Sequence, residues 1–257
     1  MASSKPINVS IEPLNYADIS TCAQIAADSF ATDPHTIVKQ LGKDGYDMAD
    51  IFRGMFLRNL ERKTIVHVKA VDQDTGKIVG HGGWAFPRVD PATIPRQGPS
   101  DEKPAALQEK TPETAAKQEK SEAPVGGRID ELHALEDKDM QEWMTEQVPS
   151  DKPCMIIACL MVHPEYQSRG VGSALIQHGN KTADQLGLSI YVHSSDQAWK
   201  AYSKFGFTTM RELDIDLDEY APRPPRDDEH VMGKKGIGKW GKYMIRYMVR
   251  TPVKASE

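Results

Sequence analysis

Two glycines lie two residues apart, at Gly170 and Gly172, between an apolar run and a helical pattern. A strand, a glycine-bearing turn and a helix together form an anion-binding geometry, because the first N–H groups of a helix have no intrahelical partner and the helix dipole adds positive potential there. Glycine also removes the side chains that would keep a phosphate away. The surrounding residues add donors: Gln167, Ser168, Arg169 and Ser173. The spacing matches neither the dinucleotide fingerprint nor the Walker phosphate loop, so the motif predicts either an anion site of another kind or a simple tight turn.

The net charge, the apolar runs and the cysteines of the chain limit which functions such a site could have. The 257 residues carry a net charge of −5 with a pI near 5.9, which argues against nucleic acid as a partner. No apolar run approaches the roughly 18 residues of a spanning helix, and the N-terminus lacks a signal-peptide pattern, so we expect no membrane association. Three cysteines without metal-ligand spacing (Cys22, Cys154, Cys159) indicate reduced core residues and a cytoplasmic protein.

The elements that must position this turn follow from hydrophobic periodicity. Residues 15–31 and 46–63 have helical spacing, and a hairpin of strands at 64–71 and 77–89 follows them. The stretch 153–162 is apolar on both faces, which predicts a central strand. After it we expect a helix at 171–185, a strand at 188–195, a short helix at 196–206 and strands at 207–217 and 242–252.

Composition changes abruptly between the hairpin and the central strand. Residues 96–124 contain no aromatic residue, one leucine, five basic and six acidic residues. Such a segment buries too little apolar surface to offset its ordering entropy. We therefore predict a single domain over 1–257 with core 8–89 and 154–252. The insertion between them is 90–153, with 96–127 mobile and 128–147 helical; it is either a tolerated surface insertion or a lid over a substrate cleft.

The run Gln167-Ser168-Arg169-Gly170-Val171-Gly172 resembles the Q/R-x-x-G-x-G/A acyl-CoA pyrophosphate loop of the GNAT superfamily of N-acetyltransferases. The context agrees: LMVHPEY before the loop resembles the family's L-x-V-x-P-x-Y, AYSKFGF resembles its L-Y-x-x-x-G-F, and DTGKIVG resembles its second hairpin. The matches span roughly residues 10–89 and 154–250. The sequence from Ala183 to Ser195 is most similar to fungal small-molecule members of the family. The resemblance implies an α+β fold, a mixed, mostly antiparallel sheet flanked by helices, whose two central parallel strands splay apart.

The resemblance also implies acetyl-CoA as co-substrate and no metal. Backbone N–H groups at Met161 or Val162 would polarise the thioester oxygen. Ser195 stands where the family often has asparagine, seven positions before its tyrosine. The implied acyl-CoA contacts are Leu160, Met161, Val162, Gln167, Ser168, Arg169, Gly170, Val171, Gly172, Ser173, Ser195 and Tyr202.

For catalysis, the resemblance places Tyr202 as the general acid that protonates the departing CoA thiolate. Many members carry a glutamate base on the strand before the loop, but residues 153–162 contain no carboxylate. His193 and His81, on predicted strands, are the candidate base or relay, and a water chain is the alternative. Trp84 either lines the acceptor pocket or packs in the core.

The predicted reaction is therefore transfer of an acetyl group to a primary amine of a small molecule by direct attack. The acidic net charge favours a cationic amine. The alternatives are a protein lysine or N-terminal acetyltransferase, and a non-catalytic acyl-CoA-binding module. We expect a monomer or homodimer with no nucleic-acid or membrane partner. The candidate pocket walls are the residues around 33–46, the insertion and the loop after Tyr220.

Overall fold

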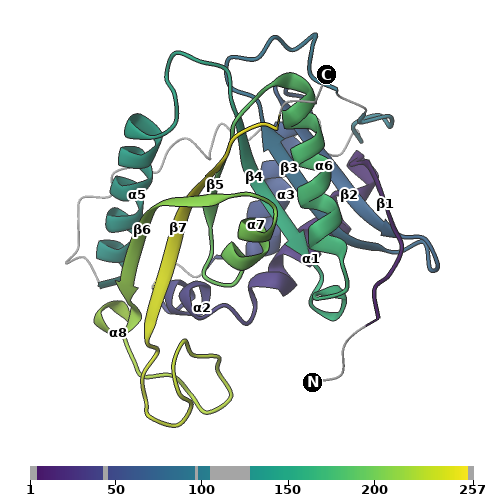
Figure 1. Ribbon diagram of the computed structural model, residues 1–257. Helices are drawn as coiled ribbons and strands as arrows, with labels where there is room; N and C mark the ends of the chain where they lie inside the picture. Colours follow the sequence, from purple (N-terminus) through teal and green to yellow (C-terminus); the bar gives the residue numbers. More distant parts are fainter. Residues whose placement is uncertain (1–4, 43–45, 96–97, 105–127, 254–257) are drawn as a thin grey trace.

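In the computed structural model, which describes residues 5–42, 46–95, 98–104 and 128–253, a seven-stranded sheet is flanked by helices (Figure 1). The strands are β1 (Val9–Pro13), β2 (Ile65–Asp72), β3 (Ile78–Ala85), β4 (Met155–Val162), β5 (Ile190–Ser194), β6 (Thr208–Asp216) and β7 (Lys242–Arg250). The α-helices are α1 (Ile19–Phe30), α2 (Pro34–Gln40), α3 (Met48–Asn59), α5 (Arg128–Glu146), α6 (Val171–Leu186), α7 (Trp199–Lys204) and α8 (Leu217–Tyr220). Short 3-10 turns precede α1 (Tyr16–Asp18) and follow β4 (Pro164–Tyr166).

The strand order is β1-β2-β3-β4-β5-β7-β6, and only the central β4–β5 pair is parallel. That pair holds together through two positions, Met155 opposite Ile190 and Ile156 opposite Tyr191. Beyond them the two strands diverge and leave a V-shaped gap in the middle of the sheet. The predicted α+β fold with a splayed central pair is confirmed.

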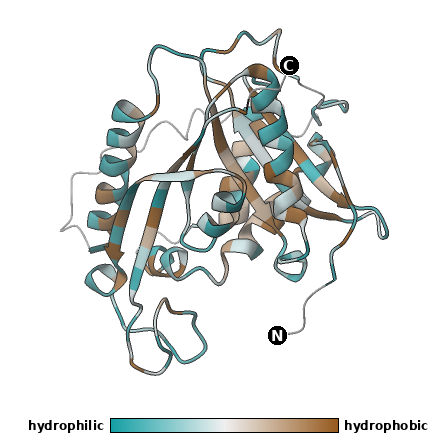
Figure 2. Cartoon of the chain, viewed as in Figure 1, coloured by the Kyte–Doolittle hydropathy of each residue, from teal (hydrophilic) through white to brown (hydrophobic). Residues whose placement is uncertain are grey.

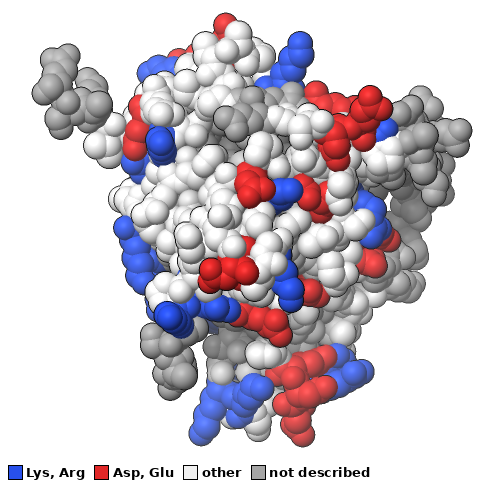
Figure 3. All heavy atoms as spheres, turned by 90° about the vertical axis from the view of Figure 1, so that its right-hand side faces the viewer, with Lys and Arg blue, Asp and Glu red and all other residues white. Residues whose placement is uncertain are grey.

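Helices cover both faces of the sheet. The apolar side of α6 packs on β2, β3, β4 and β5, whereas α1 and α3 form a separate cluster on the opposite face. A third cluster joins α2, α5 and α8 to β6 and β7. Figure 2 shows the consequence in hydropathy, with brown residues concentrated on the strands and the inward sides of the helices. On the β1 side of the molecule, basic and acidic side chains are interspersed (Figure 3).

The structure contains elements that periodicity does not predict. β1 pairs with β2 at one end of the sheet, and α2 occupies part of the predicted 33–46 loop. Pro34 at the first turn and the Asp33 side chain, which accepts from the Thr36 N–H, start α2 in the usual way. Seven residues are too few for a visible amphipathic pattern.

The segment between β3 and β4 is described in part. Asp101 accepts hydrogen bonds from the Tyr16 and Ala17 N–H groups, which attaches this part of the segment to the 3-10 turn that precedes α1. The rest of the predicted mobile stretch, 96–97 and 105–127, lies outside the described residues. α5 lies where we predict a helix, at 128–147. Among the described helices, none is long and apolar enough to cross a membrane.

Candidate active site

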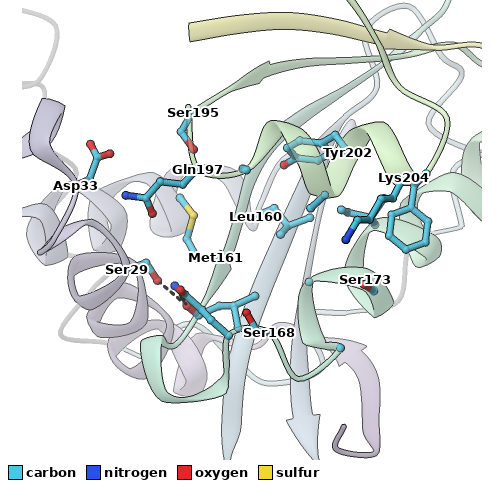
Figure 4. Close-up of a pocket in the computed structure, with 18 of the residues that line it drawn as sticks. Ser29, Asp33, Leu160, Met161, Ser168, Ser173, Ser195, Gln197, Tyr202 and Lys204 are labelled. Atoms are coloured by element: carbon cyan, nitrogen blue, oxygen red, sulfur yellow. Dashed lines mark hydrogen bonds between the residues drawn. The ribbon is translucent and has the colours of Figure 1, made fainter. Parts of the chain in front are cut away.

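A cavity of about 380 Å³ occupies the gap between β4 and β5 and continues to the first turn of α6. We call it the loop cavity (Figure 4). Ten of the twelve predicted acyl-CoA contacts line it: Leu160, Met161, Val162, Gln167, Ser168, Gly170, Gly172, Ser173, Ser195 and Tyr202. The other two residues have other roles. Val171 is buried in the core, and Arg169 lies over the Tyr166 ring and donates to the Lys5 carbonyl.

The two glycines serve different purposes. Gly170 is the N-cap of α6 with φ of +96°, a left-handed conformation that other residues adopt with strain. Gly172 lies inside the first helical turn, and an added Cβ there would meet only Val162, at an ordinary 3.7 Å. The fold itself therefore does not require glycine at 172. Its missing side chain leaves space next to the unpaired N–H groups of the helix start, where an anion would bind.

A β-bulge opens the gap and selects the backbone groups that face it. The β3–β4 register shifts so that Ala158 has no partner, which bends β4. The His163 N–H donates to the Val79 carbonyl at 2.9 Å. Because N–H groups of successive strand residues point to opposite edges, the Met161 N–H also faces β3, whereas those of Leu160 and Val162 face the gap. Of the two predicted donors, the structure therefore favours Val162.

The edge of β4 at Val162 is further fixed from the cavity side. Its carbonyl accepts hydrogen bonds from Ser29 Oγ at 2.9 Å and Gln167 Nε2 at 3.3 Å (Figure 4). These bonds tie α1 and the glycine loop to the same strand end. The Val162 N–H is thus held in a defined position at the wall of the loop cavity.

A second cavity, of about 350 Å³, lies on the other side of the β4–β5 gap and is walled by α2. We call it the α2 cavity. It shares lining residues with the loop cavity, among them Asp33, Ser195 and Tyr202, so the two meet at the gap. The rest of its wall comes from α3, β4, β5 and β7, including Met48, Phe52, Ala158, His193 and Tyr243.

Tyr202 lies on α7 at the junction of the two cavities. The residue is 5% exposed, its ring packs against Phe207 with centroids 5.3 Å apart, and burial raises the pKa of its hydroxyl. The hydroxyl is therefore protonated at neutral pH and is a weaker acid than a free tyrosine, so its case as a proton donor to a developing thiolate rests on its position at the gap. The structure therefore places the predicted acid where both cavities reach it.

Asp33 is a site residue that the sequence analysis did not single out. It is 3% exposed and lines both cavities, and its Oδ2 accepts from Thr36 N–H and Oγ1 at 2.9 Å. Its Oδ1 is buried as well. Burial, the negative charge of Asp33 and a hydrogen bond to the Asp33 carboxylate raise the pKa of Tyr243 beside it. A buried carboxylate in a cavity wall attracts a cationic ligand.

His193 lines the α2 cavity but not the loop cavity. The residue is solvent-exposed on β5, yet desolvation by the surrounding protein lowers its pKa to about 4. The opposing charges of Glu136 and His35 act on it more weakly. The ring stands 5.2 Å from that of Tyr247. His193 is therefore neutral at pH 7, on the acceptor side of Tyr202.

The other predicted base, His81, lies elsewhere. It is fully buried on β3, with its ring 5.1 Å from Phe56 and its Nδ1 3.9 Å from Cys159 Sγ. Burial lowers its pKa to about 3. β4 separates β3 from the gap, so the structure places this residue in the core and in neither cavity lining.

Trp84 is also a core residue in the structure. It is 2% exposed, its ring lies 5.6 Å from His178, and Gly179 of α6 makes room for it, because a Cβ there would approach within 2.4 Å. The predicted role in acceptor binding is thus replaced by packing between β3 and α6. All three cysteines are free and buried, as expected. In the described part of the chain, no group of three or more His, Cys, Asp or Glu could hold a metal ion.

Comparisons with known proteins agree with this geometry. Residues 133–209 match the model of the acetyltransferase (GNAT) domain, and this stretch supplies β4, α6, β5 and α7. This part of the chain is thus similar to a GNAT acetyltransferase domain, and the match together with the geometry of the site supports an N-acetyltransferase.

Relatives and solved structures extend the comparison. Two curated relatives, the cysteine-rich protein 2-binding proteins of Mus musculus and Homo sapiens, are each 31% identical over 75 residues. The match covers 29% of this chain and only 10% of either relative. Arylalkylamine N-acetyltransferase 2 from Aedes aegypti is similar in structure, with a TM-score of 0.54, 14% identity and coverage of 95% and 99% of the two chains. A histone acetyltransferase HPA2-related structure from Corynebacterium glutamicum has a TM-score of 0.51, 18% identity and coverage of 98% and 100%. At these identities the likeness shows a shared fold.

Proposed function

We propose that this chain transfers the acetyl group of acetyl-CoA to a primary amine of a small molecule by direct attack. The observation that carries the proposal is the junction of the two cavities, where Tyr202 and Asp33 line both. The loop cavity would take the CoA arm, with the pyrophosphate at the start of α6. The α2 cavity would take the amine.

In the proposed reaction, the amine arrives protonated and loses a proton to Asp33, directly or through water. Its nitrogen lone pair then attacks the thioester carbonyl carbon, while the Val162 N–H stabilises the oxygen that gains charge. The C–S bond breaks as the amide forms, and the sulfur takes the proton of Tyr202. The acylated nitrogen then releases its second proton, through water, to the Tyr202 phenolate, which restores the hydroxyl. Neutral His193 offers a second proton acceptor on the amine side.

The acceptor side favours a small molecule over a protein side chain. The α2 cavity is walled on several sides by α2, α3 and β7, and apolar rings of Phe30 and Phe52 line it beside the single Asp33 carboxylate. A cationic amine with an apolar body fits such a wall. The Aedes aegypti protein of similar fold is an arylalkylamine N-acetyltransferase, and this class of acceptor is compatible with the proposal.

A non-catalytic acyl-CoA-binding module is the second candidate, because β4 carries no carboxylate. Asp33 weakens that argument, since it brings a carboxylate to the same gap from the N-cap of α2.

The test is a titration of the purified protein with acetyl-CoA, with ATP and NAD as controls, followed by an amine library scored by release of free thiol. We expect a dissociation constant of about 1–100 μM for acetyl-CoA only, and turnover with some amines. The Tyr202→Phe variant should keep this affinity and lose about 10- to 100-fold in kcat. Acetyl-CoA binding without turnover of any amine would favour the binding module, and absence of CoA binding would contradict the family assignment of the glycine loop.

A further inference from the structure

One carboxylate outside the two cavities touches two residues that line the α2 cavity. Glu136, on α5, accepts a hydrogen bond from His35 Nε2 with one oxygen and from Lys39 Nζ, at 2.5 Å, with the other. His35 and Lys39 both belong to α2 and line the α2 cavity. Glu136 thus connects the segment between β3 and β4 to the proposed acceptor site without lining that site.

The helix that carries Glu136 is firmly attached to the sheet. Arg211 of β6 pairs with Asp139 and, at 2.8 Å, with Glu142 of α5. The Trp143 ring lies 5.0 Å from that of Tyr247 on β7, and Leu132 is fully buried in the same cluster. α5 is therefore a fixed support on which α2 can be held.

The α2 helix itself needs such a support. Its seven residues are too few for a stable isolated helix, so its position depends on tertiary contacts. The cap of this helix is Asp33, and its next residues supply the cavity wall. A shift of α2 would therefore move the proposed proton acceptor and the wall together.

The Glu136 carboxylate that contacts His35 and Lys39 also stays ionised. The Glu136 side chain is 16% exposed, and burial alone would raise its pKa. The hydrogen bond from His35 and the charge of Lys39 outweigh burial and lower the pKa of Glu136 to about 2. The carboxylate consequently stays charged at every pH at which activity would be measured, and it neutralises Lys39 next to a cavity meant for a cation.

We propose that Glu136 is a positioning residue for the acceptor: through His35 and Lys39, α5 holds α2 in the place that shapes the α2 cavity. The inference rests on the proposed function, in which that cavity takes the amine. It makes α5 a determinant of acceptor selectivity, although no residue of α5 lines either cavity.

The test compares Glu136→Gln with Glu142→Gln, a matched charge removal on the same helix whose partner Arg211 keeps Asp139. For Glu136→Gln we expect the acceptor KM to rise about tenfold, the effect of one lost charge-assisted contact, with kcat less affected and acetyl-CoA affinity unchanged. Glu136→Leu, which removes hydrogen bonding as well, should shift KM further. Hydrogen exchange should become faster in residues 34–40 in both Glu136 variants, and Glu142→Gln should leave KM and this exchange unchanged.

These readouts separate the inference from the function on which it rests. If α2 exchange is unchanged in Glu136→Gln, or changes while the acceptor KM does not, the positioning role is wrong. If the wild-type protein binds acetyl-CoA but acetylates no amine, the proposed function fails, whereas the exchange data still report whether Glu136 holds α2. Retained acetyl-CoA binding shows that each variant is folded.

Discussion

The two cavities that meet at the β4–β5 gap are built in opposite ways. Apart from Ser29, Phe30 and Asp33, the lining of the loop cavity comes from residues 160–205, which form one continuous strand-loop-helix-strand-helix unit. The α2 cavity is assembled from α1, α2, α3, β4, β5, α7 and β7, which are spread over more than 200 positions of the chain.

The difference extends to the chemistry each cavity offers. At the glycine loop the binding groups are backbone N–H groups and a helix dipole, which suit a constant anionic ligand and tolerate changes in side chains. In the α2 cavity the recognising groups are side chains such as Asp33, His35 and Lys39. One cavity is therefore suited to a fixed co-substrate, and the other to an acceptor that substitutions can redefine.

The largest expected effect is a loss of acetyl-CoA affinity when a side chain fills the loop cavity. In Gly172→Glu, a side chain and a negative charge should enter the anion site while the helical backbone stays unstrained, because the Cβ has room. We expect acetyl-CoA affinity to fall at least about 100-fold, since a like charge meets a phosphate at short range in a site of reduced dielectric. Calorimetric titration measures it.

Gln177→Glu is the control for this variant, because it adds the same charge at an exposed position of α6 outside the loop cavity lining. It should bind acetyl-CoA as the wild type does. Retained affinity in Gly172→Glu would show that the pyrophosphate does not sit at this helix start. Gly170→Glu is a less informative variant, because the left-handed backbone at 170 strains any side chain.

The α2 cavity should respond to the loss of one charge. Asparagine caps helices as well as aspartate, so Asp33→Asn should keep α2 in place. It removes the proton acceptor and the cation partner, and we expect kcat/KM for the amine to fall about 100-fold. Acetyl-CoA affinity should change less than about twofold, well below the 1.4 kcal/mol of a tenfold effect. Steady-state kinetics and titration together give both numbers.

Asp47→Asn provides the control, since Asp47 caps α3 in the same manner and lines neither cavity. Its kinetics should match those of the wild type. If Asp33→Asn acetylates amines at the wild-type rate, the proton leaves by another route, such as His193 or water.

The contrast between the cavities also explains which parts of the site could be predicted. A local motif shows the loop cavity, because Gly170 must adopt a positive φ and the neighbouring donors follow within six residues. The position of Tyr202 follows from its resemblance to a family pattern. The choice of Val162 over Met161 required the register of β4 and its bulge at Ala158, which alternation alone does not reveal.

The acceptor side could not be predicted in the same way. The pair Asp33-Pro34 is a readable helix start, but its burial depends on Tyr243, which is more than 200 residues away. The sequence makes His81 a plausible base only if its strand lines the gap. In the strand order, β4 lies between the gap and β3, the strand that carries His81. This is a property of the sheet topology, which a local sequence pattern does not contain.

The smallest expected effect concerns stability on the acceptor side. His193 has a folded-state pKa of about 4, below its ordinary value near 6.5, so the unfolded chain binds more protons between these values. The stability that neutral His193 contributes is therefore complete above about pH 6.5 and is lost as pH falls toward 4. Glu136, with a pKa lowered to about 2, loses its contribution only at lower pH. The window from pH 6.5 to 4.5 thus reports mainly on histidines.

We expect His193→Gln to lose less unfolding free energy than the wild type between pH 6.5 and 4.5. The difference should be modest, because the imidazole reaches solvent inside the cavity, and His81 retains its own acid sensitivity in both proteins. Chemical denaturation at the two pH values measures it, with the exposed His230→Gln as control. An identical pH dependence in His193→Gln and the wild type would mean that the α2 cavity is wet enough to leave this ring unperturbed. The acceptor side would then be as open as the face of a protein-modifying enzyme, which is the property that separates the two classes of acceptor.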